Sequence, residues 1–127
     1  MQTKLWAGRI LSGLAVAFLI FDASLKLLQV PMAIEANAEL GYPSSVIVPI
    51  GLIEVACLIV YLVPQTSVLG AVLWTGYLGG AIATHVRVGN PLFSHTLFPI
   101  YVALFLWGGI WLRDEKLRAV FPLRATI

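Results

Sequence analysis

Residues 5–28 read LWAGRILSGLAVAFLIFDASLKLL, an apolar run whose only charged side chains are Arg9, Asp22 and Lys26. A helix needs about 20 predominantly apolar residues to cross the hydrocarbon core of a bilayer. The run meets that length, and it shows no clean small-residue cleavage site of a signal peptide before Asp22. We therefore expect a retained first transmembrane helix.

Three further apolar stretches follow, at about residues 45–63, 67–87 and 96–112. Helix-breaking residues separate them, because Pro31 cannot continue the first helix, Pro64 marks a tight hairpin, and Asn90-Pro91 precedes the last stretch. The composition agrees, since 60% of the side chains are hydrophobic and 11% are charged. The sequence predicts an all-α, four-transmembrane-helix bundle that forms a single integral membrane domain over residues 1–127.

The basic residues predict the orientation of the bundle. Four crossings place both termini and the Pro64 hairpin on one side, and that side holds six of the eight basic residues, namely Lys4, Arg9, Arg113, Lys116, Arg118 and Arg124. By the positive-inside rule, both termini are expected in the cytoplasm. The basic residues form no patch with interleaved aromatic residues, so nucleic acid is excluded as a partner.

The connection after the first span contains a candidate helix. Met32, Ala36 and Leu40 share one helical face, Glu35 and Glu39 share another, and Gly41 ends the segment. This pattern predicts a short amphipathic helix in the first outer loop. An ordinary polar loop is the alternative.

Polar and ionisable side chains gather toward the predicted outer half of the bundle. Such groups cost about 2.5–3.5 kcal/mol each in a membrane, and they generally face partners or water. The set comprises Asp22, Lys26, Glu54, Tyr77, His85, Arg87, Asn90 and His95. Asp22 and Lys26 are four residues apart and share a helix face.

Two interpretations of this set remain open. Two acidic groups, Asp22 and Glu54, balance two basic groups, Lys26 and Arg87, so a structural ion-pair network that fixes helix register needs the same residues. Alternatively, the network lines a pocket open to the outer leaflet, where histidines move protons near neutral pH.

Other features of the spans favour plain packing. Gly76, Gly80 and Thr84 follow one another at steps of four, a small-residue ridge that lets a neighbouring helix approach closely. Cys57 has no second cysteine to pair with, which leaves it as a small buried hydrophobe. Haem is disfavoured as a cofactor, since the two histidines lie near each other on one side of the bundle, and without a compact ligand motif we predict no metal site.

The segment GYLGGAIATHVR at residues 76–87, followed by Gly89-Asn90-Pro91, resembles the most recognisable part of the DoxX-like family of small bacterial membrane proteins. Further matches in order and spacing are Arg9, Gly13, Lys26, Gly51 and Glu54, so the resemblance covers nearly the whole chain. It implies a four-helix protein of the bacterial cytoplasmic membrane. It also marks Lys26, Glu54, His85 and Arg87 as the polar signature of the family.

The resemblance implies function only at the level of a class. The family name comes from a subunit of a thiosulfate:quinone oxidoreductase, and other members are linked to membrane-associated redox or thiol-stress systems. We therefore expect a redox-associated protein, an oxidoreductase or a subunit of one, that binds a quinone or another small lipophilic molecule near the outer leaflet.

Each polar residue receives an expected role in this hypothesis. Glu54 acts as the buried proton acceptor, His85 relays the proton, and Lys26 and Arg87 hold an anionic or carbonyl oxygen. The remaining pocket residues are Asp22, Tyr77, Asn90 and His95. The alternative is a non-catalytic binding or transport module that acts as a homo-oligomer. The expected partners are membrane lipid, a lipophilic small molecule, and either further copies of the chain or a redox partner protein.

Overall fold

A computed structural model describes residues 2–124, and these residues form helices and turns without a strand. The long helices are α1 (Gln2–Leu27), α3 (Ile47–Leu62), α4 (Ser67–Val88) and α5 (Phe98–Arg113). Two shorter helices are α2 (Pro31–Glu39), in the first connection, and α6 (Glu115–Val120), after α5. The predicted all-α fold is confirmed.

Four segments are long and apolar enough to cross a membrane: Gln2–Leu27, Ser44–Leu62, Pro64–Val88 and Leu92–Arg113. They correspond to the four predicted spans. Short 3-10 turns, Ser44–Val46 and Pro64–Thr66, lead into α3 and α4, and a π-helical turn, Leu92–Thr96, leads into α5. The predicted last outer loop is therefore partly helical.

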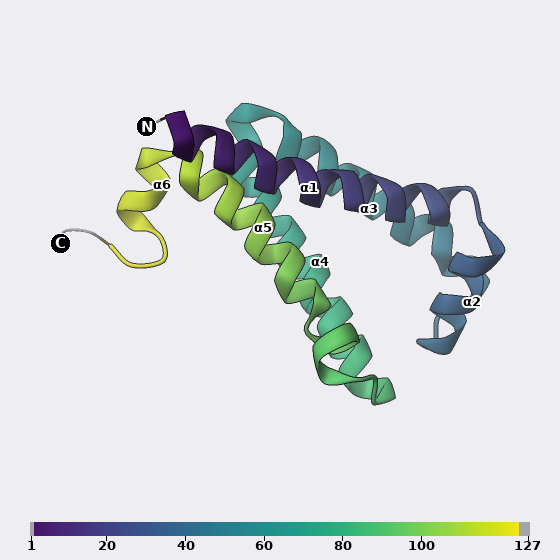
Figure 1. Cartoon of the computed structure of the whole chain (residues 1–127). Coiled ribbons are helices and arrows are strands. Elements are labelled where there is room, and N and C mark those ends of the chain that lie inside the picture. The colour runs from purple at the N-terminus through teal and green to yellow at the C-terminus, as the bar shows by residue number, and fades with distance from the viewer. Residues whose placement is uncertain (1, 125–127) are drawn as a thin grey trace.

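The long helices form a ring in which α1 contacts α3 and α5, and α4 also contacts α3 and α5 (Figure 1). The start of α1 and helix α6 lie together at one end, which we call the terminal end. Toward the opposite end, which carries α2 and which we call the α2 end, the α4–α5 pair diverges from the α1–α3 pair (Figure 1). The helices are thus joined tightly at one end and spread at the other.

Close helix contacts hold the terminal end together. A Cβ atom on Gly8 of α1 would lie 2.6 Å from the carbonyl oxygen of Gly109 in α5. A Cβ atom on Gly70 of α4 would overlap the backbone of Tyr61 in α3. The main apolar core lies between these helices, around the fully buried Trp74. Small residues at these points let the backbones meet.

The small-residue ridge of α4, predicted from Gly76, Gly80 and Thr84, is not in close contact with a neighbouring helix at its two glycines. Nothing lies within 4 Å of a Cβ atom built on Gly76, Gly79 or Gly80, so no helix of the described chain packs closely against them. Gly76 and Gly80 instead line a cavity described below.

The predicted amphipathic helix is confirmed as α2, although its inward face differs from the expected one. Ala33 is its buried residue, and Asn37 is half-buried, whereas Met32 is 61% exposed. The segment ends at Leu40, and the following Gly41 has a φ of 92°, a backbone conformation that favours glycine.

Candidate functional site

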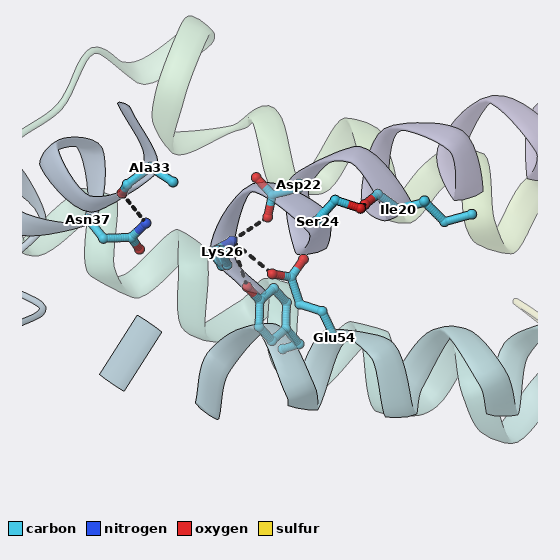
Figure 2. Close-up of polar contacts among 8 residues, drawn as sticks. Ile20, Asp22, Ser24, Lys26, Ala33, Asn37 and Glu54 are labelled. Carbon is cyan, nitrogen blue, oxygen red and sulfur yellow. Dashed lines mark hydrogen bonds and ion pairs between the residues drawn. The ribbon is translucent and has the colours of Figure 1, made fainter. Parts of the chain in front are cut away.

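Lys26 is the centre of a buried polar cluster that joins three helices (Figure 2). Its ammonium donates to Asp22 Oδ2, one turn earlier in α1, and to Glu54 Oε1 of α3 at 2.8 Å. The hydroxyl oxygen of Tyr77, in α4, lies 3.5 Å from the same nitrogen. We call Asp22, Lys26, Glu54 and Tyr77 the ion cluster.

The backbone allows this approach because Gly51 lies one turn before Glu54 in α3. A Cβ atom on Gly51 would lie 3.2 Å from Lys26 Cβ and 3.1 Å from Leu27 Cδ2, tighter than ordinary packing. The absence of a side chain at Gly51 therefore lets the last turn of α1 reach Glu54. Lys26 itself is only 8% exposed.

One oxygen of the ion cluster has no partner. Glu54 is completely buried, and its Oε2 atom accepts no hydrogen bond from any described residue. If both carboxyl groups and the ammonium are ionised, the ion cluster carries a net charge of −1, so one proton on either carboxyl group makes it neutral. The ion cluster therefore contains one more acidic group than basic groups, and one of its buried oxygens lacks a hydrogen-bond partner among the described residues.

A second group of polar residues surrounds the junction between α4 and the π-helical turn. Gly89 ends α4 with a φ of 74°, and the N–H of Asn90 donates back to the His85 carbonyl. The Asn90 amide nitrogen lies 2.8 Å from His85 Nδ1. When that amide donates, the ring proton of His85 is on Nε2.

His95 completes this histidine group, which consists of His85, Asn90 and His95. The two imidazole rings meet edge to face with centroids 5.9 Å apart, and Ser94 Oγ lies 2.8 Å from His95 Nδ1. The described residues contain no cluster of three or more potential metal ligands.

Arg87 lies apart from both groups. Its guanidinium donates to the carbonyl oxygen of Leu40 at 2.6 Å, and it forms no ion pair within residues 2–124, where the two salt bridges both belong to Lys26. The expected charge balance between Arg87 and a carboxylate is therefore not found. Arg87 instead ties the end of α2 to α4.

Two cavities open beside these groups. The first cavity, of about 220 Å³, is bounded by apolar side chains including Phe18, Phe98 and Val102, and by the polar residues Asp22, Lys26, Asn37 and His85. The second cavity, of about 310 Å³, is lined by Tyr77, Thr84 and His85 together with the glycine ridge. Asn37, Leu40, Ala81 and His85 line both cavities.

The predicted site residues thus divide by position. Asp22, Lys26 and His85 line the first cavity and Tyr77 lines the second. Glu54 lies behind Lys26 and lines neither cavity, and the same is true of Arg87, Asn90 and His95. Lys26, which lines the first cavity, contacts both Glu54 and Tyr77 and so connects Glu54 to that cavity.

Two residues that the sequence did not single out help to form the site. Asn37 of α2 lines both cavities and donates through its side chain to the Ala33 carbonyl at 2.8 Å. Tyr42 shares a 2.8 Å hydrogen bond with Thr84 of α4. The only sequence signal for either was a polar side chain on the connection that follows the first span.

Removing the Tyr42 hydroxyl tests how α2 is held. We expect Tyr42→Phe to weaken the attachment to Thr84 by about 0.5–1.5 kcal/mol and to speed hydrogen exchange of the α2 amides several-fold. Tyr101→Phe is the matched control, because the Tyr101 hydroxyl donates to the carbonyl oxygen of Phe93 in the π-helical turn before α5 and not to α2. Equal exchange of α2 in wild type and Tyr42→Phe would contradict the prediction.

Comparisons with known proteins identify the family. No curated protein and no solved structure matches the chain. The DoxX-like family matches residues 10–109, a range that begins within α1, ends within α5 and contains the ion cluster and the histidine group. The chain belongs to the DoxX-like family, and it is a multi-pass membrane protein of that family.

Proposed function

We propose that this chain binds a small lipophilic molecule with a carbonyl or hydroxyl head group, a quinone being the favoured class, in the first cavity. The lining supports this proposal because it combines apolar walls, including Phe18 and Phe98, with polar groups at one side from Asp22, Lys26 and His85. Small-molecule sites usually have this character. The first cavity of about 220 Å³ suits a single-ring head group, with the apolar tail left in the bilayer.

The proton chemistry of a quinone fits the residues around the first cavity. Reduction of a quinone to a quinol adds two electrons and two protons. In its doubly protonated form, His85 donates one proton from Nε2 to one oxygen and becomes neutral, and a protonated Asp22, which lines the cavity, supplies the other, with Glu54 as the reserve carboxyl group behind Lys26. The chain has a single cysteine and so cannot supply electrons from its own dithiol pair. The electrons therefore come from a redox partner protein.

The unpartnered Oε2 of Glu54 carries the proposal. Buried polar atoms in folded proteins are nearly always hydrogen-bonded, so an ion cluster that serves only to fix helix register gains nothing from leaving a carboxylate oxygen bare. A carboxyl group that gains and loses a proton during turnover can accept that proton on such an oxygen. The link to the first cavity through Lys26 and Asp22 gives that proton a route.

Native mass spectrometry of the gently purified protein tests this function directly. We expect a bound quinone or other lipophile in the wild type, and about tenfold lower occupancy in His85→Leu, whose ring lines the first cavity. Quinone-linked turnover with a redox partner should fall by about 10²–10⁴-fold in Glu54→Gln, which keeps the shape of the side chain and removes its proton.

Glu35→Gln is the matched control for Glu54→Gln, because Glu35 is an exposed carboxylate on α2. It should leave occupancy and turnover unchanged. An empty wild-type protein, or full turnover in Glu54→Gln, would contradict the proposal and leave the ion cluster with a structural role.

The orientation proposed with this function places the α2 end at the outer leaflet of the bacterial cytoplasmic membrane and both termini in the cytoplasm. The basic residues support it, because Lys4, Arg9, Arg113, Lys116 and Arg118 all belong to the terminal end. A cysteine placed at exposed Glu39 should then react with an impermeant thiol reagent applied from outside.

A second candidate function is a non-catalytic binding or transport module that acts as a homo-oligomer. The observation in its favour is that Gly79 and the two glycines of the ridge, Gly76 and Gly80, have no close neighbour, which leaves part of the α4 surface open to another helix. Gly79→Leu should break an oligomer formed through that face. A monomer in lipid nanodiscs would remove this candidate.

A further inference from the structure

A third cavity, of about 410 Å³, lies at the terminal end, away from the ion cluster and the histidine group. Two guanidinium groups line it, Arg9 from α1 and Arg113 from the last turn of α5. The buried side chains of Ser12 and Tyr61 also line it, as does Asp114. Its remaining lining is largely apolar, with Val16, Leu62 and Ile110.

Arg113 is fixed in place without a carboxylate. Its Nε donates to the Gly109 carbonyl at 2.9 Å, and its Nη2 donates to Ser12 Oγ at 3.0 Å. Ser12 then donates to the Tyr61 hydroxyl at 2.8 Å, and Tyr61 donates to the Leu106 carbonyl at 2.7 Å. Every group in this chain of hydrogen bonds is neutral except the guanidinium, so the positive charge of Arg113 is not compensated by it.

The glycine contact between α1 and α5 is what lets Arg113 reach across. A Cβ atom on Gly8 would lie 2.7 Å from Arg113 Cγ, so the stem of the arginine lies over the bare face of α1. The packing that joins α1 to α5 therefore also fixes the orientation of the Arg113 guanidinium. Of the five N–H donors of an arginine, two are used here, and the other three have no acceptor within residues 2–124.

Arg9 adds a second uncompensated cation. It stacks on Trp6, with the guanidinium carbon 5.0 Å from the ring centroid, and like Arg113 it forms no ion pair within residues 2–124. The Asp114 carboxylate lies at the cavity too, but its Oδ1 accepts from the backbone N–H groups of Lys116 and Leu117 at 2.9 and 3.2 Å. Two arginines and one aspartate leave a net charge of +1 on the lining.

We propose that this cavity binds the phosphate of an anionic phospholipid between Arg9 and Arg113. Guanidinium groups bind phosphate oxygens through charge-assisted hydrogen bonds, often two at a time. The site lies where a span meets the head-group region, and its apolar wall of Val16, Leu62 and Ile110 gives the glycerol and acyl chains a surface. A free phosphate ion would use the same donors but would leave that wall uncovered.

Reconstitution into nanodiscs that contain phosphatidylglycerol and phosphatidylcholine in equal parts tests the site. Native mass spectrometry should find phosphatidylglycerol retained preferentially by the wild type. Retention should fall by at least about tenfold in the Arg9→Gln/Arg113→Gln variant, because each lost charged hydrogen bond alone accounts for about that factor.

Lys4→Gln/Lys116→Gln is the matched control, because it removes the same charge from exposed residues of the terminal end that do not line the cavity. It should retain lipid as the wild type does. Equal retention in all three proteins, or equal loss in both double variants, overturns the proposal, since the effect would then be absent or due to general charge.

Two further arms keep the test decisive. Arg9→Gln alone keeps the Arg113 network intact and should still lower retention several-fold, which covers the case in which the double variant fails to fold. If millimolar inorganic phosphate displaces the lipid and raises the melting temperature while equal ionic strength of chloride does not, the ligand is free phosphate and the lipid assignment is wrong.

Discussion

Replacing Lys26 by methionine is expected to lower the free energy of unfolding by about 3–5 kcal/mol, because it leaves two carboxyl groups without their shared cation. Glu54 is completely buried, so its carboxylate cannot turn to water when the ammonium is lost. The loss is a large part of the total, since folded proteins are stable by only about 5–15 kcal/mol. Unfolding of the protein in mixed micelles, followed by tryptophan fluorescence during titration with sodium dodecyl sulfate, measures the change.

A second set of substitutions should restore the stability lost in Lys26→Met, which would not happen if that loss came from a packing defect. Adding Asp22→Asn and Glu54→Gln to Lys26→Met removes the uncompensated charges, and it should recover most of the lost stability. Lys116→Met is the control for loss of a positive charge, because Lys116 is exposed at the terminal end. If Lys26→Met destabilises no more than Lys116→Met, the ion cluster does not hold the three helices together.

Gly70→Ala is expected to destabilise the bundle by about 1–3 kcal/mol or more, because the added methyl overlaps backbone atoms of Tyr61 rather than the end of a flexible side chain. Helices α3 and α4 would have to separate to accept it. Thermal unfolding in detergent, with loss of helical circular dichroism as the signal, measures the effect.

Gly79→Ala, in the same helix, is the matched substitution with the opposite expectation. Nothing lies within 4 Å of the added methyl, and alanine favours a helix over glycine by about 0.5–1 kcal/mol. It should leave the bundle unchanged or slightly more stable. A loss in both variants would mean that the bare ridge is covered by something outside this chain.

The spans could be predicted from the sequence because each depends on local properties, namely length, hydropathy and breaks at Pro31, Pro64 and Pro91. The pairing of Asp22 with Lys26 was also accessible, since residues four apart in a helix share a face. These features need no knowledge of how the helices are arranged.

The division of the polar residues could not be predicted, because it depends on the angle between helix pairs. Lys26 and Glu54 meet through the bare surface at Gly51, whereas Arg87 reaches a backbone carbonyl on α2 instead of a carboxylate. Because every residue has a backbone carbonyl, the sequence does not show which of them accepts a hydrogen bond from a side chain. The spreading of α4 and α5 at the α2 end also leaves the glycine ridge facing a cavity, although its spacing alone favours a helix contact.

The wall of the first cavity between α1 and α5 is formed by Phe18 and Phe98, whose rings meet edge to face with centroids 5.1 Å apart. Both side chains are also about two-fifths exposed, on the surface that lipid covers, at 41% and 40%. Ala36, Asn37 and Leu40 of the α2 segment also line the first cavity, whereas on the side between α1 and α5 it is these two rings that lie toward the acyl chains. We therefore expect a ligand of the proposed kind to enter from the bilayer between α1 and α5, so that its occupancy depends on its mole fraction in the lipid rather than on its concentration in water.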